Sequence, residues 1–488
     1  MICLGLALTG CTGGPEATGV VKTLVIGATL EPPTLNPFEN TAASIPQVEL
    51  YNVYETLLKV DSTGQLQPLL AQAWEVSQDR TEYTFHLNPA ATFASGNKVD
   101  ADAVVANIER LQGDPKLSET LAAQLKVVAG AEKVDAETVV IKLTRPSMMW
   151  LYDMTSTLGM MVDPSSEVDL AKDTAGSGPY QLREYNIGQS VVLEKNPNYW
   201  GTPARFDEVT FRYFLDPNAM NAAMLAGDLD IISNLQAPDA MSQFADETRF
   251  TTVVGSTNGE VVLGLNHDNP ALAKLEVRQA ITMAIDRQAL MDTVWNGQGT
   301  LIGSMTVPTD PWYEDLSGTN PYDPAKAKQL LAQAGYASGL TLKLRVPVVP
   351  YATKSAQFVT SALRDIGVTA TIEELEFSRW IQEVLVDGNY DLTIVSHVEA
   401  RDLGKFADSS YYWHNDDPTF AELYQAADEA DSANQVPLMQ QAARRLADQA
   451  AAVWLFCLPN IVIAKPGLSG IADNMTTLSF DLTTIAHS

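Results

Sequence analysis

The last third of the chain, from about residue 265, alternates apolar runs of period two with amphipathic stretches of period 3.6. Asp323 followed by Pro324 predicts a helix start, because aspartate caps free backbone N–H groups and proline fits the first helical position; Gly335 predicts its end. The pattern also predicts strands at 340–346, 368–372 and 390–395, and helices at 355–366 and 378–386. Such alternation predicts a doubly wound α/β unit with right-handed crossovers.

The earlier part of the chain has a more mixed pattern. The segments there predict a strand at 23–27, a helix at 48–58, a strand at 83–87 and a helix that begins after the cap Asp100. Strands dominate between residues 176 and 262, with these elements: strands 191–193, 209–213 and 261–265, and one helix 218–226. A strand-rich part therefore precedes the α/β unit.

A polar and aromatic stretch follows the predicted strand 390–395. Its loop, residues 396–402, contains His397, Glu399, Arg401 and Asp402. In open α/β sheets, ligands bind beyond the carboxyl ends of the strands. The sequence therefore predicts a binding site at this loop.

Length and charge limit the class of protein. A chain of 488 residues exceeds one ordinary core, so two or three domains are expected, and a hydrophobic content of 46% is that of a globular protein. The formal net charge of −29 argues against nucleic acid as a partner, because phosphates require a basic surface.

The first residues, MICLGLALTGCTGG, resemble a bacterial lipobox, although no Lys or Arg precedes the apolar run. The resemblance implies cleavage before Cys11 and a lipid on its sulfur, which would hold the protein at a membrane without a spanning helix. Cys457 lies in an apolar run and is expected to be a buried, inert thiol.

Motifs of catalysis are missing from the chain: it has no G-x-S-x-G, G-x-x-x-x-G-K-[ST] or H-E-x-x-H sequence. We therefore predict that the protein is not an enzyme; a secreted hydrolase is the remote alternative. His397, Glu399, Asp402 and His414 are metal-ligand types, but their spacing matches no compact ligand template. No cofactor and no metal are predicted.

Several segments, in order, resemble the family 5 extracellular solute-binding proteins of ABC importers (the oligopeptide, dipeptide and nickel group). The segments are LAQAWEVS at 70–77, FASG at 93–96, GSGPY at 176–180, LEKNPNYWG at 193–201, LAGDLD at 225–230 and VRQAI at 277–281. We expect these residues to identify the fold rather than to touch ligand.

The resemblance implies an α/β, type II periplasmic-binding fold: two hinged lobes, with an extra domain inserted in the N-terminal lobe. The predicted division is a signal and tether (1–22), an N-terminal lobe (23–60, 170–262 and 458–488), an inserted domain (61–169) and a C-terminal lobe (263–457).

The resemblance also implies a function. The protein would be a monomer, lipid-anchored on the outer face of the cytoplasmic membrane, that captures short peptides between its lobes and delivers them to ABC transporter permease subunits. A nickel-chelate, haem or another small solute is the alternative ligand.

Site residues follow from the same resemblance. Peptide-binding relatives hold the ligand's α-amine with an acid that corresponds to Ala400 here, so Glu399 or Asp402 is expected to replace it. Arg401 is expected either to bind a ligand carboxylate or to order the loop through an ion pair. Further candidates are a backbone edge, the lobe crossing, and aromatic or imidazole side chains that line a pocket or belong to the core: Thr41, Ala42, Asn266, Trp380, His397, Tyr411, Tyr412 and Trp413.

Overall fold

A computed structural model describes residues 22–487 of the chain. Cys11 lies outside the described residues. Within them, no helix combines the length and the apolar character that crossing a membrane requires.

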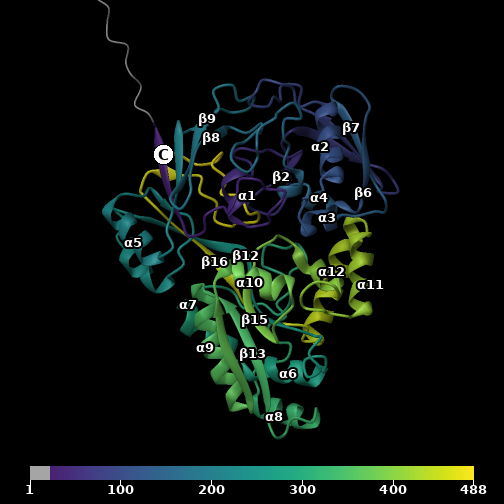
Figure 1. The fold of residues 1–488 in the computed structure, drawn as a ribbon, viewed down its shortest axis with the longest axis vertical. Coiled ribbons are helices and arrows are strands. Elements are labelled where there is room, and N and C mark those ends of the chain that lie inside the picture. Colours follow the sequence, from purple (N-terminus) through teal and green to yellow (C-terminus); the bar gives the residue numbers. More distant parts are fainter. Residues whose placement is uncertain (1–21, 488) are drawn as a thin grey trace, which may run out of the picture.

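One ten-stranded mixed sheet runs through the molecule (Figure 1). Its order is β14 (Val368–Leu375), β13 (Leu340–Pro347), β15 (Leu392–His397), β12 (Thr251–Leu265), β16 (Val453–Ala464), β11 (Ile231–Ile232), β1 (Thr23–Ala28), β10 (Glu208–Tyr213), β9 (Ser190–Lys195) and β8 (Tyr180–Asn186). We call the part around β14, β13 and β15 the C-terminal lobe and the part around β11, β1, β10, β9 and β8 the N-terminal lobe.

A second, four-stranded antiparallel sheet forms what we call the inserted domain. Its order is β4 (Ala71–Val76), β5 (Glu82–Leu87), β7 (Thr138–Leu143) and β6 (Val128–Lys133), and it carries α2 (Ala101–Gly113), α3 (Glu119–Leu125), α4 (Met149–Asp153) and the 3-10 helix η1 (Thr157–Gly159). Two short strand pairs complete the sheets: β2 (Leu58–Val60) with β3 (Leu66–Pro68), and β17 (Leu468–Ser469) with β18 (Ala486–His487). We propose that the chain divides into domains at the boundaries predicted from the sequence.

The remaining helices surround the large sheet (Figure 1). They are α1 (Ser44–Glu49), α5 (Pro217–Ala226), the 3-10 helix η2 (Pro238–Phe244), α6 (Leu275–Ala284), α7 (Arg287–Trp295), α8 (Pro324–Gln333), α9 (Pro350–Asp365), α10 (Phe377–Trp380), the π-helix η3 (Ile381–Val386), the 3-10 helix η4 (Asp402–Ala407), α11 (Pro418–Asp428) and α12 (Ser432–Asp448). Strand β13 is parallel to both β14 and β15, as the doubly wound pattern predicts.

Two long strands join the lobes. β12 has 15 residues and β16 has 12, and they pair antiparallel from Thr251↔Ala464 to Leu263↔Val453. Their register shifts between Ser256 and Glu260, so the pair is irregular where it passes from one lobe to the other. The strand predicted at 261–265 is only the end of β12. Residues 251–256 are exposed or half-buried and mix polar side chains with valines, a pattern that does not identify a buried strand.

Local capping explains why several helices begin where the sequence predicts. The Asp100 side chain accepts from the Ala103 amide, and the Asp323 side chain accepts from the Lys326 amide, with Pro324 in the first turn. Gly335 has a φ of 94°, which suits glycine after a helix.

Two predicted helices differ in the structure. The helix predicted at 48–58 ends at Glu49, because Tyr51 turns the backbone into the left-handed region (φ 65°) and the following apolar residues enter the core as turns and as strand β2. The helix predicted at 378–386 is a short α-helix continued by a π-helix.

Candidate functional site

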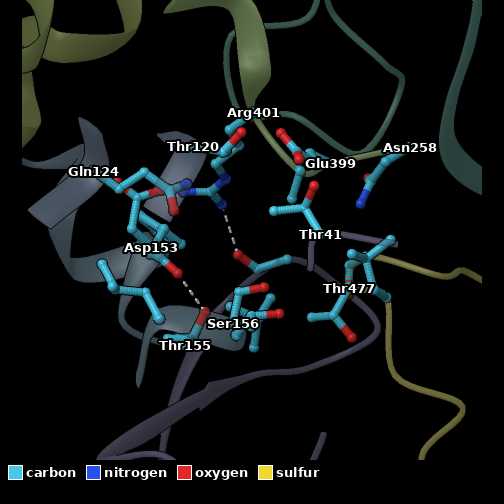
Figure 2. Close-up of a pocket in the computed structure, with 18 of the residues that line it drawn as sticks. Thr41, Thr120, Gln124, Asp153, Thr155, Ser156, Asn258, Glu399, Arg401 and Thr477 are labelled. Atoms are coloured by element: carbon cyan, nitrogen blue, oxygen red, sulfur yellow. Dashed lines mark hydrogen bonds between the residues drawn. The ribbon is translucent and has the colours of Figure 1, made fainter. Parts of the chain in front are cut away.

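A cavity of about 80 Å³ lies where the two lobes and the inserted domain meet. Figure 2 shows side chains from all three parts around one space. The lining is largely polar: Thr41, Val60, Gly64, Thr120, Leu121, Gln124, Tyr152, Asp153, Thr155, Ser156, Thr157, Leu158, Asn258, Thr309, Asp310, Glu399, Ala400, Arg401, Thr476, Thr477 and Leu478. The loop after β15 therefore faces the cavity, as the strand-end rule predicts.

Arg401 reaches across this cavity from the C-terminal lobe. Its Nη2 donates to the Gly64 carbonyl at 2.9 Å, and its guanidinium lies 3.2 Å from the centre of the Tyr152 ring (Figure 2). Its backbone is left-handed (φ 61°), so the loop turns sharply at this residue. Arg401 forms no ion pair with Glu399 or Asp402 in the described structure; Glu399 pairs with Lys405 instead.

Glu399 lines the same cavity and forms an ion pair with Lys405 of η4. Burial alone would lower the pKa of Lys405, but the neighbouring groups Glu399, Tyr411 and Asp402 raise it above its usual value. Lys405 is therefore a fixed positive charge behind the cavity wall. The side chain of Glu399 is 32% exposed and lines the cavity.

Asp402 lies beneath the loop and is not among the residues that line the cavity. Its side chain is buried, and neither carboxylate oxygen has a hydrogen-bond donor in the described structure. Burial raises its pKa well above the usual range, and the same holds for Glu260 on β12 nearby. Both carboxyl groups are thereby favoured in the neutral form.

The aromatic triplet packs under the loop instead of lining the cavity. The Trp413 ring stacks on Phe406 at 3.9 Å, and the Tyr412 hydroxyl lies in a hydrogen bond 2.9 Å from His397 Nε2. Tyr411 packs edge-on against Trp413. Burial and the Lys405 charge lower the pKa of His397 to about 3, so this imidazole is neutral.

Of the other predicted residues, only Thr41 lines the cavity. The amide of Ala42 donates to the Asn40 side chain at 2.8 Å. Asn266 directly follows β12, and its side-chain amide donates to the carbonyls of residues 388 and 390. Trp380 Nε1 donates to Thr393 Oγ1 at 3.0 Å. These three residues support the C-terminal lobe or the loop before α1, and the cavity does not include them.

Several lining residues are not predicted from the sequence. Asp153 and Gln124 come from short helices of the inserted domain, Asn258 from the lobe crossing, Asp310 from a loop, and residues 476–478 from the C-terminal segment. They lie far apart along the chain, so spacing cannot group them. Asn258 lies outside the strand predicted at 261–265, so its place in the long strand β12 is known from the structure alone.

The signature segments meet at a buried carboxyl group away from the cavity. Glu55 accepts hydrogen bonds from Ser177 Oγ at 2.8 Å, the Tyr199 hydroxyl at 2.6 Å and Trp200 Nε1 at 2.8 Å. Burial raises the pKa of Glu55 to about 7, and these donors oppose part of the rise. Two signature segments, GSGPY and LEKNPNYWG, therefore stabilise the fold through hydrogen bonds to one carboxyl group.

No group of three or more His, Cys, Asp or Glu side chains in residues 22–487 is placed to hold a metal ion. His397 is buried against Tyr412, and His414 lies 3.7 Å from the carboxylate of Asp268. Neither histidine lines the cavity.

Two lobes joined by a strand pair, with a polar cavity between them, define a solute-binding protein. The family model "Bacterial extracellular solute-binding proteins, family 5 Middle" matches residues 65–419, so the chain belongs to this family. Family 5 proteins are extracytoplasmic substrate-binding components of ABC importers. The family predicted from the sequence is confirmed.

Relatives and solved structures agree with this placement. The dipeptide-binding protein of Escherichia coli K12 is 26% identical over 428 residues, which cover 81% of this chain and 79% of that protein. The structure of AgaA from A. tumefaciens R10 with agropinic acid gives a TM-score of 0.84 at 24% identity, over 96% of this chain and 99% of that one. AppA from Bacillus subtilis with a nonapeptide gives 0.83 at 21% identity, over 96% and 99%. The type II periplasmic-binding fold is confirmed.

Proposed function

We propose that the protein captures short peptides in the cavity between its lobes and delivers them to the permease subunits of an ABC importer. The supporting observation is a cavity lined by both basic and acidic groups: the guanidinium of Arg401, and the carboxyl groups of Asp153, Asp310 and Glu399. A peptide is a zwitterion and matches such a pair of charges. The similarity to a dipeptide-binding protein supports the same ligand class.

In this proposal Arg401 binds the carboxylate of the peptide. Its planar fork presents several N–H groups, and the bond to Gly64 and the stacking on Tyr152 hold it in one orientation. Of the two acids predicted to bind the α-amine, Glu399 alone lines the cavity, and the chain edge at Thr41 is our candidate for contact with the peptide backbone.

A thermal-shift panel on the full chain tests the ligand class. The panel contains a pool of di- to hexapeptides, a pool of peptide-free metabolites, and nickel with and without free histidine. A ligand at about 100 times its Kd adds about 2.7 kcal/mol to the free energy of unfolding, a readable rise in Tm. We expect a rise with the peptide pool. A rise only with nickel plus histidine, or only with the metabolites, would replace the peptide proposal.

Arg401→Lys tests the carboxylate contact. It keeps the charge but removes the fork and the stacking, so we expect peptide affinity to fall about 10- to 100-fold, as for a lost charge-assisted hydrogen-bond pair. Arg364→Lys, at an exposed site in α9, is the matched control. Peptides with an amidated carboxyl end should bind the wild-type protein and Arg401→Lys equally weakly; discrimination kept in the variant would contradict the assignment.

The lipid anchor at Cys11 is part of the same proposal. Intact-mass measurement of the membrane fraction should show a diacylated N-terminus, and Cys11→Ser should release the protein from that fraction. Unchanged membrane attachment of the variant would exclude this anchor.

A further inference from the structure

Asp153 is an acid of the cavity wall that no cation of the described structure neutralises. It ends α4 of the inserted domain, and Gln124 Nε2 donates to its Oδ1 at 3.0 Å. Within residues 22–487, no Lys, Arg or His nitrogen lies within ion-pair distance of it. The two other acids of the wall differ: Glu399 is paired with Lys405, and Asp310 accepts the Val307 amide at 3.0 Å.

The surroundings of Asp153 would favour a cation. Burial, then the charges of Asp428 on α11 and of Glu399 beyond β15, raise the pKa of Asp153 to about 8; Lys405 and the Gln124 amide oppose part of the rise. Tyr424 of α11 is the remaining titratable neighbour, and burial followed by Asp428 and Asp153 raises its pKa. Without a ligand, Asp153 is therefore largely neutral at pH 7.

Asp153 also lies in the same wall as Arg401, since the guanidinium of Arg401 stacks on the ring of the preceding residue, Tyr152. The two side chains form no ion pair with each other. Figure 2 shows both directed into the space they share. One wall thus presents a free acid near a fixed guanidinium.

We infer that Asp153 is the subsite for a cationic group of the solute, so that the cavity selects solutes carrying an ammonium or guanidinium close to a carboxylate. The inference rests on the proposed function where the solute is taken to be a peptide. When the ammonium enters, Asp153 loses its proton to solvent and the carboxylate accepts N–H bonds from the ligand. One proton leaves for each ligand bound, and no covalent bond changes.

Asp153→Asn tests the subsite, because the amide keeps the shape and the contact with Gln124 but cannot ionise. Asp135→Asn, at an exposed turn of the same domain, is the matched control. The probes are the di- to hexapeptide pool with free amino ends and the same pool after N-acetylation. We expect Asp153→Asn, and acetylation of the pool, each to weaken binding about 10- to 100-fold, and the two together to add little more.

Proton release on ligand binding distinguishes a ligand-binding role of Asp153 from a purely structural role, which would not change the number of protons released. Titration calorimetry of the wild-type protein at pH 7, in phosphate and in Tris, should report about one proton released per ligand. Asp153→Asn should release almost none, and Asp135→Asn as many as the wild type. The wild-type measurements with free and acetylated pools need no variant, so a misfolded Asp153→Asn leaves the inference testable.

The outcomes separate the two proposals. If peptides bind and Asp153→Asn keeps both affinity and proton release, the subsite is wrong and the peptide function stands. If the wild-type protein binds neither peptide pool, a panel of arginine, ornithine and putrescine tests whether Asp153 binds a cationic group of another solute. Binding of these amines that is lost in Asp153→Asn supports the subsite; no binding, or binding unchanged by the substitution, overturns it.

Discussion

Asp428 is the centre of a contact between the lobes that lies outside the cavity. The residue ends α11 of the C-terminal lobe and is almost fully buried. Its carboxylate accepts hydrogen bonds from the segment before α4 of the inserted domain: from Arg145 Nη1 at 2.8 Å, Ser147 Oγ at 2.8 Å and the Met149 amide at 2.9 Å. A carboxylate at a helix C-terminus is electrostatically unfavourable. These donors therefore stabilise α11 only while the two parts are in contact.

We expect Asp428→Ala to weaken closure of the lobes by about 3 kcal/mol. The estimate takes about 1–2 kcal/mol for each of the two buried donors left without an acceptor, Ser147 Oγ and the Met149 amide. Arg145 adds little to it, because 42% of its side chain is exposed and can be hydrated. If ligand binding requires closure, apparent affinity should fall about 100-fold.

Calorimetric Kd values and small-angle X-ray scattering of the ligand-free protein check this expectation. Asp428→Asn is the graded comparison: its amide oxygen still accepts from Ser147 and Met149, so its loss of affinity should be much smaller. Asp428→Ala should also increase the radius of gyration. Unchanged affinity and unchanged radius of gyration in Asp428→Ala would refute the claim that this contact holds the lobes together.

Three further predictions concern buried polar groups outside the cavity. The raised pKa of Glu55 means that the folded state binds its proton more tightly than the unfolded state, so this group makes the free energy of unfolding fall by about 3 kcal/mol as pH rises from 4.5 to about 7. Urea denaturation should show Glu55→Gln gaining stability relative to wild type across that range; a constant difference would contradict it. Asn266→Ala should lose about 2 kcal/mol of stability, since the carbonyls of Gly388 and Tyr390 lose their donor, and keep ligand affinity; reduced affinity would place Asn266 at the ligand. Burial raises the pKa of the Cys457 thiol, so peptide mapping should find it unmodified by iodoacetamide until urea is added; rapid labelling of the native protein would contradict its burial.

Much of the C-terminal lobe could be predicted from the sequence because its elements carry local signals. Asp323, Pro324 and Gly335 set the limits of one helix through caps that depend on neighbouring residues only. The failure at 48–58 has the opposite origin. Its apolar spacing fits a helix, but the backbone turn at Tyr51 places the following residues in a core built from distant parts of the chain.

Only the part of the site that lies in the loop 396–402 could be predicted from the sequence. The strand-end rule placed Glu399 and Arg401 at the cavity without any knowledge of the rest of the fold. It could not tell which side chains of that loop point outward, so His397 and Asp402 were candidates although both are buried beneath it. Asp153 depends on how the inserted domain docks, which no local pattern encodes.

The position of β16 within the large sheet has a consequence for biosynthesis. In the strand order, β16 lies between β12, with the C-terminal strands beyond it, and β11, with the N-terminal strands beyond it. Yet β16 is made from residues 453–464, which follow all the other strands of this sheet in the chain. A growing chain therefore cannot join the two halves of its sheet until these residues have been made. The middle of this sheet is thus its last part to be synthesised, after both edge strands, β14 and β8.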